Sequence, residues 1–162
     1  GATGGVGHFG VQAAKATGAH VTANCSAGNT ELARELGADE VFGYSSDNAI
    51  GTGIQFDAIL DAWGMMEQKE IYRLLKPEGI YASPLYMPWT IFQASWVRIR
   101  YGRRMTSSNM RKRPEDFYEL EALIEQKKLK PVIENIYPLN KSSEAFDKAE
   151  FGKPRGKVII TV

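Results

Sequence analysis

Apolar and polar positions follow two alternating periods along the chain, and this alternation predicts helices and strands in turn. Apolar positions recur at helical spacing before Thr17-Gly18, and a β-rich stretch covers residues 20–25. The same pattern predicts further helices over 29–36, 67–75, 114–128 and 142–151 and further strands over 40–44, 56–61, 80–83, 132–137 and 157–162. Strands that alternate with helices form a parallel sheet covered on both faces. We therefore expect an α/β protein, in which residues 56–61 form a buried strand.

The helical pattern also predicts which side of each helix packs against its neighbours. In the first helix, the positions expected to face the sheet are Val6, Gly10, Ala13, Ala14 and Thr17. The positions expected to face solvent are His8, Gln12 and Lys15, so His8 is interpreted as a surface histidine rather than a proton shuttle. In the helix that begins at Pro114, a packing stripe is expected from Phe117, Leu120, Leu123 and Ile124.

A glycine-rich turn stands directly before the first helix. Its residues are Gly1, Ala2, Thr3, Gly4, Gly5, Val6 and Gly7, an A-x-G-x-x-G pattern. Gly4 would let the main chain approach a pyrophosphate, and Gly7 would let the helix pack closely on its strand. The N–H groups at the helix start would then face the phosphates, with the positive end of the helix dipole behind them. The following strand completes a βαβ unit, so we predict a dinucleotide site rather than a merely structural turn.

The position of this turn in the chain bears on the fold. In a Rossmann unit a hydrophobic strand leads into the glycine turn, yet nothing precedes Gly1 in this sequence. We therefore expect a doubly wound parallel sheet of the Rossmann type with its first strand missing. The chain would then be the cofactor-binding part of a larger oxidoreductase.

The carboxyl ends of the strands should gather the remaining site residues, because ligands of such sheets bind there. The turn, the end of the strand at 20–25 and the loops after Asp61 and Ser83 are expected around one crevice. Residues 61–64 would lie beside the adenosine half of the cofactor. The residues expected near the nicotinamide are Ser83, Pro84 and Leu85. Asp57 and Asp61 stand at opposite ends of one strand and make a poor acid–base pair.

Composition limits the other classes of function. The chain is 43% hydrophobic and 24% charged with a net charge of +1, as in an ordinary globular protein. Residues 80–101 are broken by Pro84 and Pro88 and carry Arg98 and Arg100, so no membrane span is expected. With one cysteine and no signal peptide, a cytoplasmic, reducing location is expected. The two histidines and Cys25 lack zinc-site spacing, so no zinc is expected.

One basic cluster suggests a different partner. Its members are Arg98, Arg100, Arg103, Arg104, Arg111, Lys112 and Arg113, with Trp96 and Tyr101 among them. Such a cluster can bind nucleic acid, but a net charge near zero argues against a strong nucleic-acid surface. We interpret the cluster as a solvated face or the rim of a cleft or subunit contact, and keep nucleic acid as an alternative.

An ordered set of motifs resembles the medium-chain dehydrogenase/reductase superfamily. The motifs are GATGGVGHF at 1–9, LGADEV at 36–41, FDAILD at 56–61, LLKPEG at 74–79 and GKVIITV at 156–162. The set is most similar to the zinc-independent, quinone-oxidoreductase-like branch. This resemblance implies an NAD(P)-binding Rossmann domain at 1–112 and a segment at 113–162 that returns to an absent GroES-like catalytic domain. It also implies hydride transfer from the nicotinamide to a quinone or activated enone.

The choice of cofactor depends on the end of the strand at 20–25. An NAD site has an acidic residue there, whereas this chain has Cys25-Ser26-Ala27, which favours NADPH over NADH. The resemblance places Ser26 and Tyr44 at the adenosine phosphate and ribose. Gly28 departs from the pattern, because many relatives carry Lys or Arg there. Alternatively, Ser26 caps the next helix and Tyr44 is a half-buried strand-end residue.

The sequence leaves the activity of the isolated chain open. No catalytic residue can be named, and a non-catalytic NAD(P)-binding or sensor module remains an alternative to an enzyme fragment. Exposed apolar faces and open strand edges predict a homo-oligomer, or association with a missing N-terminal domain, with weak activity at best.

Overall fold

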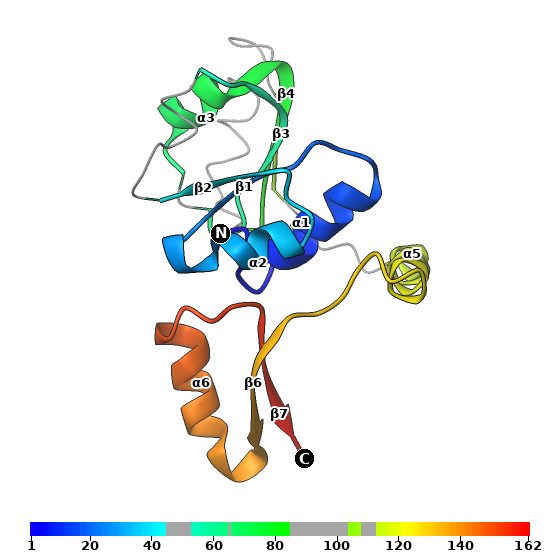
Figure 1. Ribbon diagram of the computed structural model, residues 1–162, viewed down its shortest axis with the longest axis vertical. Helices are drawn as coiled ribbons and strands as arrows, with labels where there is room; N and C mark the ends of the chain where they lie inside the picture. The colour runs from blue at the N-terminus through cyan, green and yellow to red at the C-terminus, as the bar shows by residue number, and fades with distance from the viewer. Residues whose placement is uncertain (45–52, 65, 85–103, 108–112) are drawn as a thin grey trace. The chain divides into compact units, whose positions relative to one another are not determined.

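The computed structural model describes residues 1–44, 53–64, 66–84, 104–107 and 113–162 (Figure 1). These residues belong to two compact units. The first unit contains Gly1–Tyr44 and Arg113–Val162, and the second contains Ser45–Lys112.

The N-terminal part of the first unit is a βαβ arrangement. Helix α1 (Gly7–Ala16) leads to β1 (Thr22–Cys25), and after the 3₁₀ turn η1 (Ala27–Asn29) helix α2 (Thr30–Glu35) leads to β2 (Glu40–Gly43). The two strands pair in parallel. Their core is made of small apolar side chains, namely Val11, Val21, Ala23, Cys25, Ala33 and Ala38. Both helices are followed by a glycine with positive φ, Gly18 at 83° and Gly37 at 103°, as helix ends require.

The C-terminal part of the first unit repeats the strand–helix–strand arrangement. Helix α5 (Pro114–Glu125) precedes β6 (Ile133–Pro138), η3 (Leu139–Lys141), α6 (Ser142–Phe151) and β7 (Lys157–Thr161). Strands β6 and β7 pair in parallel, and α6 packs against both of them (Figure 1). Glu134 on β6 forms ion pairs with Lys148 at 3.4 Å and Arg155 at 3.5 Å, which connects the strand to the helix and to the next loop.

The second unit is a three-stranded parallel sheet with the order β3-β4-β5. Its elements are β3 (Phe56–Leu60), α3 (Gln68–Leu74), β4 (Leu75–Ser83) and β5 (Arg104–Ser107). Its buried centre contains Ile71, Leu75 and Tyr81, so α3 and β4 hold this unit together.

The structure confirms the α/β class and the alternation of helices and strands, but three local expectations were wrong. Strand β4 begins at Leu75, so the expected turn over 76–79 is a bulge within the strand, where Glu78 has φ 65°. Helix α5 ends at Glu125, before the lysines expected in its last turn. Strand β3 is an edge strand with mostly exposed side chains rather than a buried one.

The predicted faces of α1 were wrong for His8, Gln12 and Val6, although Lys15 is exposed and Ala14 packs against the core, as expected. The buried residues of α1 are Gly7, His8, Val11 and Gln12, whereas Val6 is 46% exposed. The cause is the C-terminal segment, which covers the side expected to face solvent. Gln12 Nε2 donates to Lys130 O at 2.9 Å, and Lys130 N donates to Gln12 Oε1 at 2.8 Å. A polar side chain is thus buried with its hydrogen bonds satisfied.

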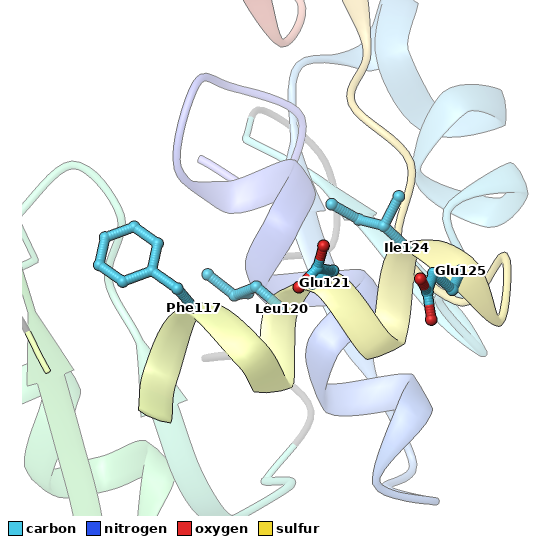
Figure 2. Close-up of a pocket in the computed structure, with 5 residues that line it drawn as sticks. All are labelled: Phe117, Leu120, Glu121, Ile124 and Glu125. Atoms are coloured by element: carbon cyan, nitrogen blue, oxygen red, sulfur yellow. The ribbon is translucent and has the colours of Figure 1, made fainter. Parts of the chain in front are cut away.

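The predicted packing stripe of α5 is exposed. No residue of this helix is buried, and Phe117, Leu120 and Ile124 are 64%, 45% and 51% exposed. These three side chains line one hollow together with Glu121 and Glu125 (Figure 2). Among the described residues nothing covers this face, so α5 has the expected pattern without the expected packing.

Candidate nucleotide-binding site

The glycine turn is anchored at the carboxyl end of β1. Ala2 N donates to Asn24 O at 3.1 Å, and the side chain of Asn29 donates to Thr3 Oγ1 at 3.1 Å. Thr3 is buried, and its carbonyl accepts a hydrogen bond from Gly156 N at 2.8 Å. The turn is therefore fixed both by the strand beside it and by the loop that precedes β7.

The turn presents main-chain donors at the start of α1. The N–H groups of Gly5, Val6 and Gly7 donate to no acceptor in the described part of the chain. The next N–H group, that of His8, donates to Gly4 O at 3.1 Å. The positive end of the α1 dipole adds to the field of these donors. Such an arrangement is suited to bind an anion through the backbone.

The glycines of the turn serve different purposes. A Cβ on Gly7 would overlap Gly1 O and lie 2.8 Å from Ala2 Cα, so the fold itself requires glycine there. A Cβ on Gly4 would meet only Gly1 O, at 3.5 Å, which is an ordinary contact. No described neighbour therefore excludes a side chain at Gly4. The open space beside Gly4 is where the fingerprint expects a pyrophosphate to approach the main chain.

Ser26 and Tyr44 follow β1 and β2 and lie at the same strand ends as the turn. Tyr44 N donates to Cys25 O at 3.1 Å, which brings the residues after the two strands together. Ser26 is exposed and makes no side-chain cap, and Tyr44 is 52% exposed. The structure thus contradicts the capping interpretation of Ser26, whereas the exposure of Tyr44 agrees with the alternative of a half-buried strand-end residue. Gly28 itself carries no charged side chain, and a Cβ there would meet nothing within 4 Å.

The other predicted site residues lie in the second unit. Ser83 is buried at the end of β4 and Pro84 follows it, while Leu85 lies outside the described residues. The loop after β3 is shaped by Asp61, whose carboxylate accepts hydrogen bonds from the main chain of Trp63 at 3.1 Å, Gly64 at 2.8 Å and Met66 at 3.0 Å.

Tyr81 completes the surroundings of Asp61. Its hydroxyl donates to Asp61 Oδ2 at 2.9 Å. Burial alone would raise the pKa of Asp61, but the hydrogen bonds from Met66, Gly64 and Tyr81 outweigh it and lower that pKa. Burial and the contact with Asp61 raise the pKa of Tyr81. Asp57 is paired separately with Lys76 at 2.9 Å.

Two residues beside the turn were missed by the sequence analysis, His8 and Lys157. His8 is fully buried, and its Nδ1 lies 2.8 Å from Gly4 O. Burial lowers the pKa of His8, and the nearby charge of Lys157 also lowers it. The hydrogen bond with the carbonyl of Gly4 raises the pKa but does not outweigh the burial. Lys157 approaches from β7, with Nζ 5.7 Å from the centre of the Phe9 ring. No local sequence signal relates Lys157 to the turn, because their proximity depends on how β7 is placed.

The described residues offer no metal site. Within the described ranges, no three His, Cys, Asp or Glu side chains are grouped so that they could hold a metal ion. Cys25 is fully buried, and burial raises the pKa of its thiol, which disfavours the thiolate that zinc requires. These residues do not fit a zinc ion. In the described part of the chain, no helix has the length and apolarity needed to cross a bilayer.

Comparison with known proteins identifies the family. A family model described as "Zinc-binding dehydrogenase" matches residues 36–160. The chain belongs to this family. It is 35% identical to the "NAD(P)H oxidoreductase RTN4IP1, mitochondrial" of Bos taurus, with 100% of this chain and 46% of the relative covered. It is 29% identical to the "Quinone-oxidoreductase homolog, chloroplastic" of Spinacia oleracea, with 98% of this chain and 50% of the relative covered.

Solved structures of the same family have the same fold. The quinone oxidoreductase from Coxiella burnetii matches with a TM-score of 0.82 and 25% identity, over 99% of this chain and 50% of that one. The expected membership in the medium-chain dehydrogenase/reductase superfamily, in its quinone-oxidoreductase-like branch, is confirmed, as is the Rossmann-like fold. The chain spans about half the length of the curated relatives it matches.

Proposed function

We propose that this chain is the cofactor-binding part of an NADPH-dependent oxidoreductase that transfers hydride to a quinone or an activated enone. The observation that carries the proposal is the glycine turn, where three main-chain donors lack partners among the described residues and Gly4 leaves open space. Relatives named as an NAD(P)H oxidoreductase, a quinone-oxidoreductase homolog and a trans-enoyl reductase support the reaction class.

Each part of the cofactor has a proposed set of contacts. The main chain from Ala2 to Gly7 would hold the pyrophosphate, and Ser26 and Tyr44 would contact the adenosine end. Ser83, Pro84 and Leu85 are proposed to lie near the nicotinamide. The cofactor supplies the hydride when bound, and the protein binds and orients it.

The proposed domain organisation follows the family resemblance. Residues 1–112 would form the NAD(P)-binding domain, and residues 113–162 would return to a GroES-like domain. The exposed apolar face of α5 supports this proposal, because such a face is expected to pack on another part of the protein. The proton for the product would come from substrate or from that domain, since no catalytic acid is proposed within this chain.

The first test is the substitution Gly4→Asp. It places a carboxylate beside the proposed pyrophosphate position, so NADPH affinity should fall more than about tenfold, or about 1.4 kcal/mol. Ser143→Asp adds the same charge at an exposed position of α6 and should leave affinity unchanged. Calorimetric titration measures both. Unaltered NADPH affinity in Gly4→Asp would show that the turn does not hold the cofactor.

The second test concerns the choice between NADPH and NADH. The strand end at Ser26 has no carboxylate, so Ser26→Asp should supply the missing ribose acceptor and repel the 2′-phosphate. Preference should move toward NADH in a fluorescence titration. Tighter binding of NADH than of NADPH by the native chain would contradict the NADPH proposal.

A non-catalytic NAD(P)-binding or sensor module is the second candidate, because no catalytic residue is proposed among the residues of this chain. An assay of NADPH oxidation with a quinone separates it from an enzyme. In the nucleic-acid alternative, Arg113 is a member of the basic cluster whose charge is already paired, with Asp116 at 2.9 Å. The remaining arginines and the lysine of the cluster, apart from Arg104 on β5, lie outside the described residues: Arg98, Arg100, Arg103, Arg111 and Lys112.

The expected absence of zinc, the homo-oligomer and the cytoplasmic location also remain proposals. Relatives carry "mitochondrial" and "chloroplastic" in their names, so fractionation of cells that produce the whole protein would test the location. Light scattering tests the association. Elemental analysis of the purified chain tests for zinc.

A further inference from the structure

The loop after β3 is held by one carboxylate, that of Asp61. It accepts hydrogen bonds from the main-chain N–H groups of Trp63, Gly64 and Met66, at 3.1, 2.8 and 3.0 Å. A further donor comes from β4, where the hydroxyl of Tyr81 lies 2.9 Å from Asp61 Oδ2. A carboxylate offers about four acceptor positions, so these donors satisfy it. The loop is therefore fixed both by its own main chain and by the neighbouring strand.

The position of the Tyr81 hydroxyl is set by the packing of its ring. Tyr81 is 7% exposed and belongs to the buried centre of the second unit, together with Ile71 and Leu75. Met66, at the end of the loop, packs against the same cluster. The ring cannot turn away from Asp61 without leaving this packed centre. The hydroxyl therefore serves as a fixed point to which the carboxylate, and through it the loop, is attached.

The loop presents an aromatic side chain at an edge of the sheet where ligands bind. Trp63 is 67% exposed, so its indole contributes little to the core and is available to a ligand. It follows the carboxyl end of β3, and ligands of open parallel sheets bind at the carboxyl ends of the strands. A contact residue binds best when the groups around it already hold it in place. The bonds to Asp61 do this for the main chain of Trp63.

We propose that Tyr81 is a positioning residue for cofactor binding, which acts through Asp61 on the loop that carries Trp63. This inference rests on the proposed function. Tyr81 would not touch the cofactor, because its ring lies in the core and its hydroxyl is bonded to Asp61. Without the hydroxyl the loop would occupy more conformations, and the cofactor would have to order it on binding, at a cost in affinity. The residues after β3 are expected beside the adenosine half of the cofactor, so the cost should appear there.

The central variant is Tyr81→Phe, which keeps the ring in the core and removes only the hydroxyl. Calorimetric titration should show NADPH affinity reduced about fivefold, as expected for the loss of one hydrogen bond that orders the loop. The affinity for 2′-phospho-ADP-ribose, which lacks the nicotinamide, should fall by the same factor. Tyr118→Phe removes the hydroxyl of an exposed tyrosine of α5 and should leave both affinities unchanged. Thermal melting checks each fold, and Asp61→Asn replaces Tyr81→Phe if that variant does not fold.

Two further measurements separate an effect through Asp61 from a general loss of packing. Burial raises the pKa of Asp61, and the bond from Tyr81, the titratable group that faces it from β4, helps to lower that pKa. The pKa should therefore rise in Tyr81→Phe, and the affinity lost relative to the native chain should be larger at about pH 5 than at about pH 8. In a chain that already carries Asp61→Asn, Tyr81→Phe should change the affinity less than about twofold.

Several outcomes would overturn the inference. Unchanged NADPH affinity in Tyr81→Phe, with Gly4→Asp still damaging, would leave the cofactor site intact and exclude Tyr81 from positioning it. Additive losses with Asp61→Asn, or a loss that does not vary with pH, would show that Tyr81 does not act through Asp61. Weaker binding of NADPH without weaker binding of 2′-phospho-ADP-ribose would contradict the assignment to the adenosine half. Failure of the native chain to bind either ligand would refute the proposed function itself.

Discussion

Helices α1 and α5 belong to the same unit and both carry apolar stripes, yet they differ in what covers them. In α1, the polar residues His8 and Gln12 are buried, because the C-terminal segment packs on that side and supplies hydrogen-bond partners for Gln12. In α5, the apolar residues Phe117 and Leu120 are exposed. An amphipathic pattern therefore predicts a helix more reliably than it predicts which side becomes buried.

The difference has a physical cause. A buried amide is tolerated when both its donor and its acceptor are satisfied, as Gln12 is by the main chain of Lys130. An apolar side chain gains nothing until another surface removes it from water. The partner surface, and not the helix alone, thus determines the burial of both helices.

The largest expected effect comes from the loop before β7, which is joined to the glycine turn by the hydrogen bond from Gly156 N to Thr3 O. Gly156 has φ 73°, and a Cβ there would overlap Val132 O and lie 2.6 Å from Val132 Cβ. Gly156→Ala should lower the free energy of unfolding by about 3 kcal/mol, from the strained backbone and the overlap together. Urea unfolding followed by circular dichroism measures it. Gly28→Ala, with open space around it, should change stability by less than about 0.5 kcal/mol.

Removal of the amide that joins α1 to the C-terminal segment should have the next largest effect. Gln12→Ala leaves the main-chain N–H and C=O of Lys130 without the side-chain partner that they have in the native chain. A loss of about 2 kcal/mol is expected. Gln126→Ala truncates an exposed glutamine and serves as the matched control. Equal stability of the two variants in chemical unfolding would show that the segment does not depend on Gln12.

His8 should make stability depend on pH. Burial lowers the pKa of His8 below its usual value of 6.5, so the unfolded chain binds a proton more readily than the folded chain. The stabilisation is present above that usual pKa and is lost as the pH falls below it. The melting temperature should therefore fall between about pH 7.5 and about pH 5. His8→Asn should reduce this fall. If the melting temperature of the variant depended on pH as that of the native chain does, His8 would not be the cause of the pH dependence.

The smallest effect on stability is expected on α5. Leu120→Ser replaces an exposed apolar side chain, so the free energy of unfolding should change by less than about 0.5 kcal/mol. Self-association in light scattering should decrease, because the apolar face is smaller. Leu129→Ser, at a buried position just after the helix, should be strongly destabilising by comparison. Similar losses for both would mean that α5 is packed after all.

The sequence by itself determined the order of the elements, the family and the turn. These follow from local chemistry, because hydrophobic periodicity and the positions of glycines determine helices, strands and turns within a few residues. Helix α6, for example, has the range 142–151 that the sequence predicts. Ser26 and Tyr44 could be placed at strand ends for the same reason. Only the tertiary structure decided that His8 and Gln12 are buried, that Lys157 reaches the turn and that α5 is exposed. Each of these depends on contacts between residues far apart in the chain, which no local pattern encodes.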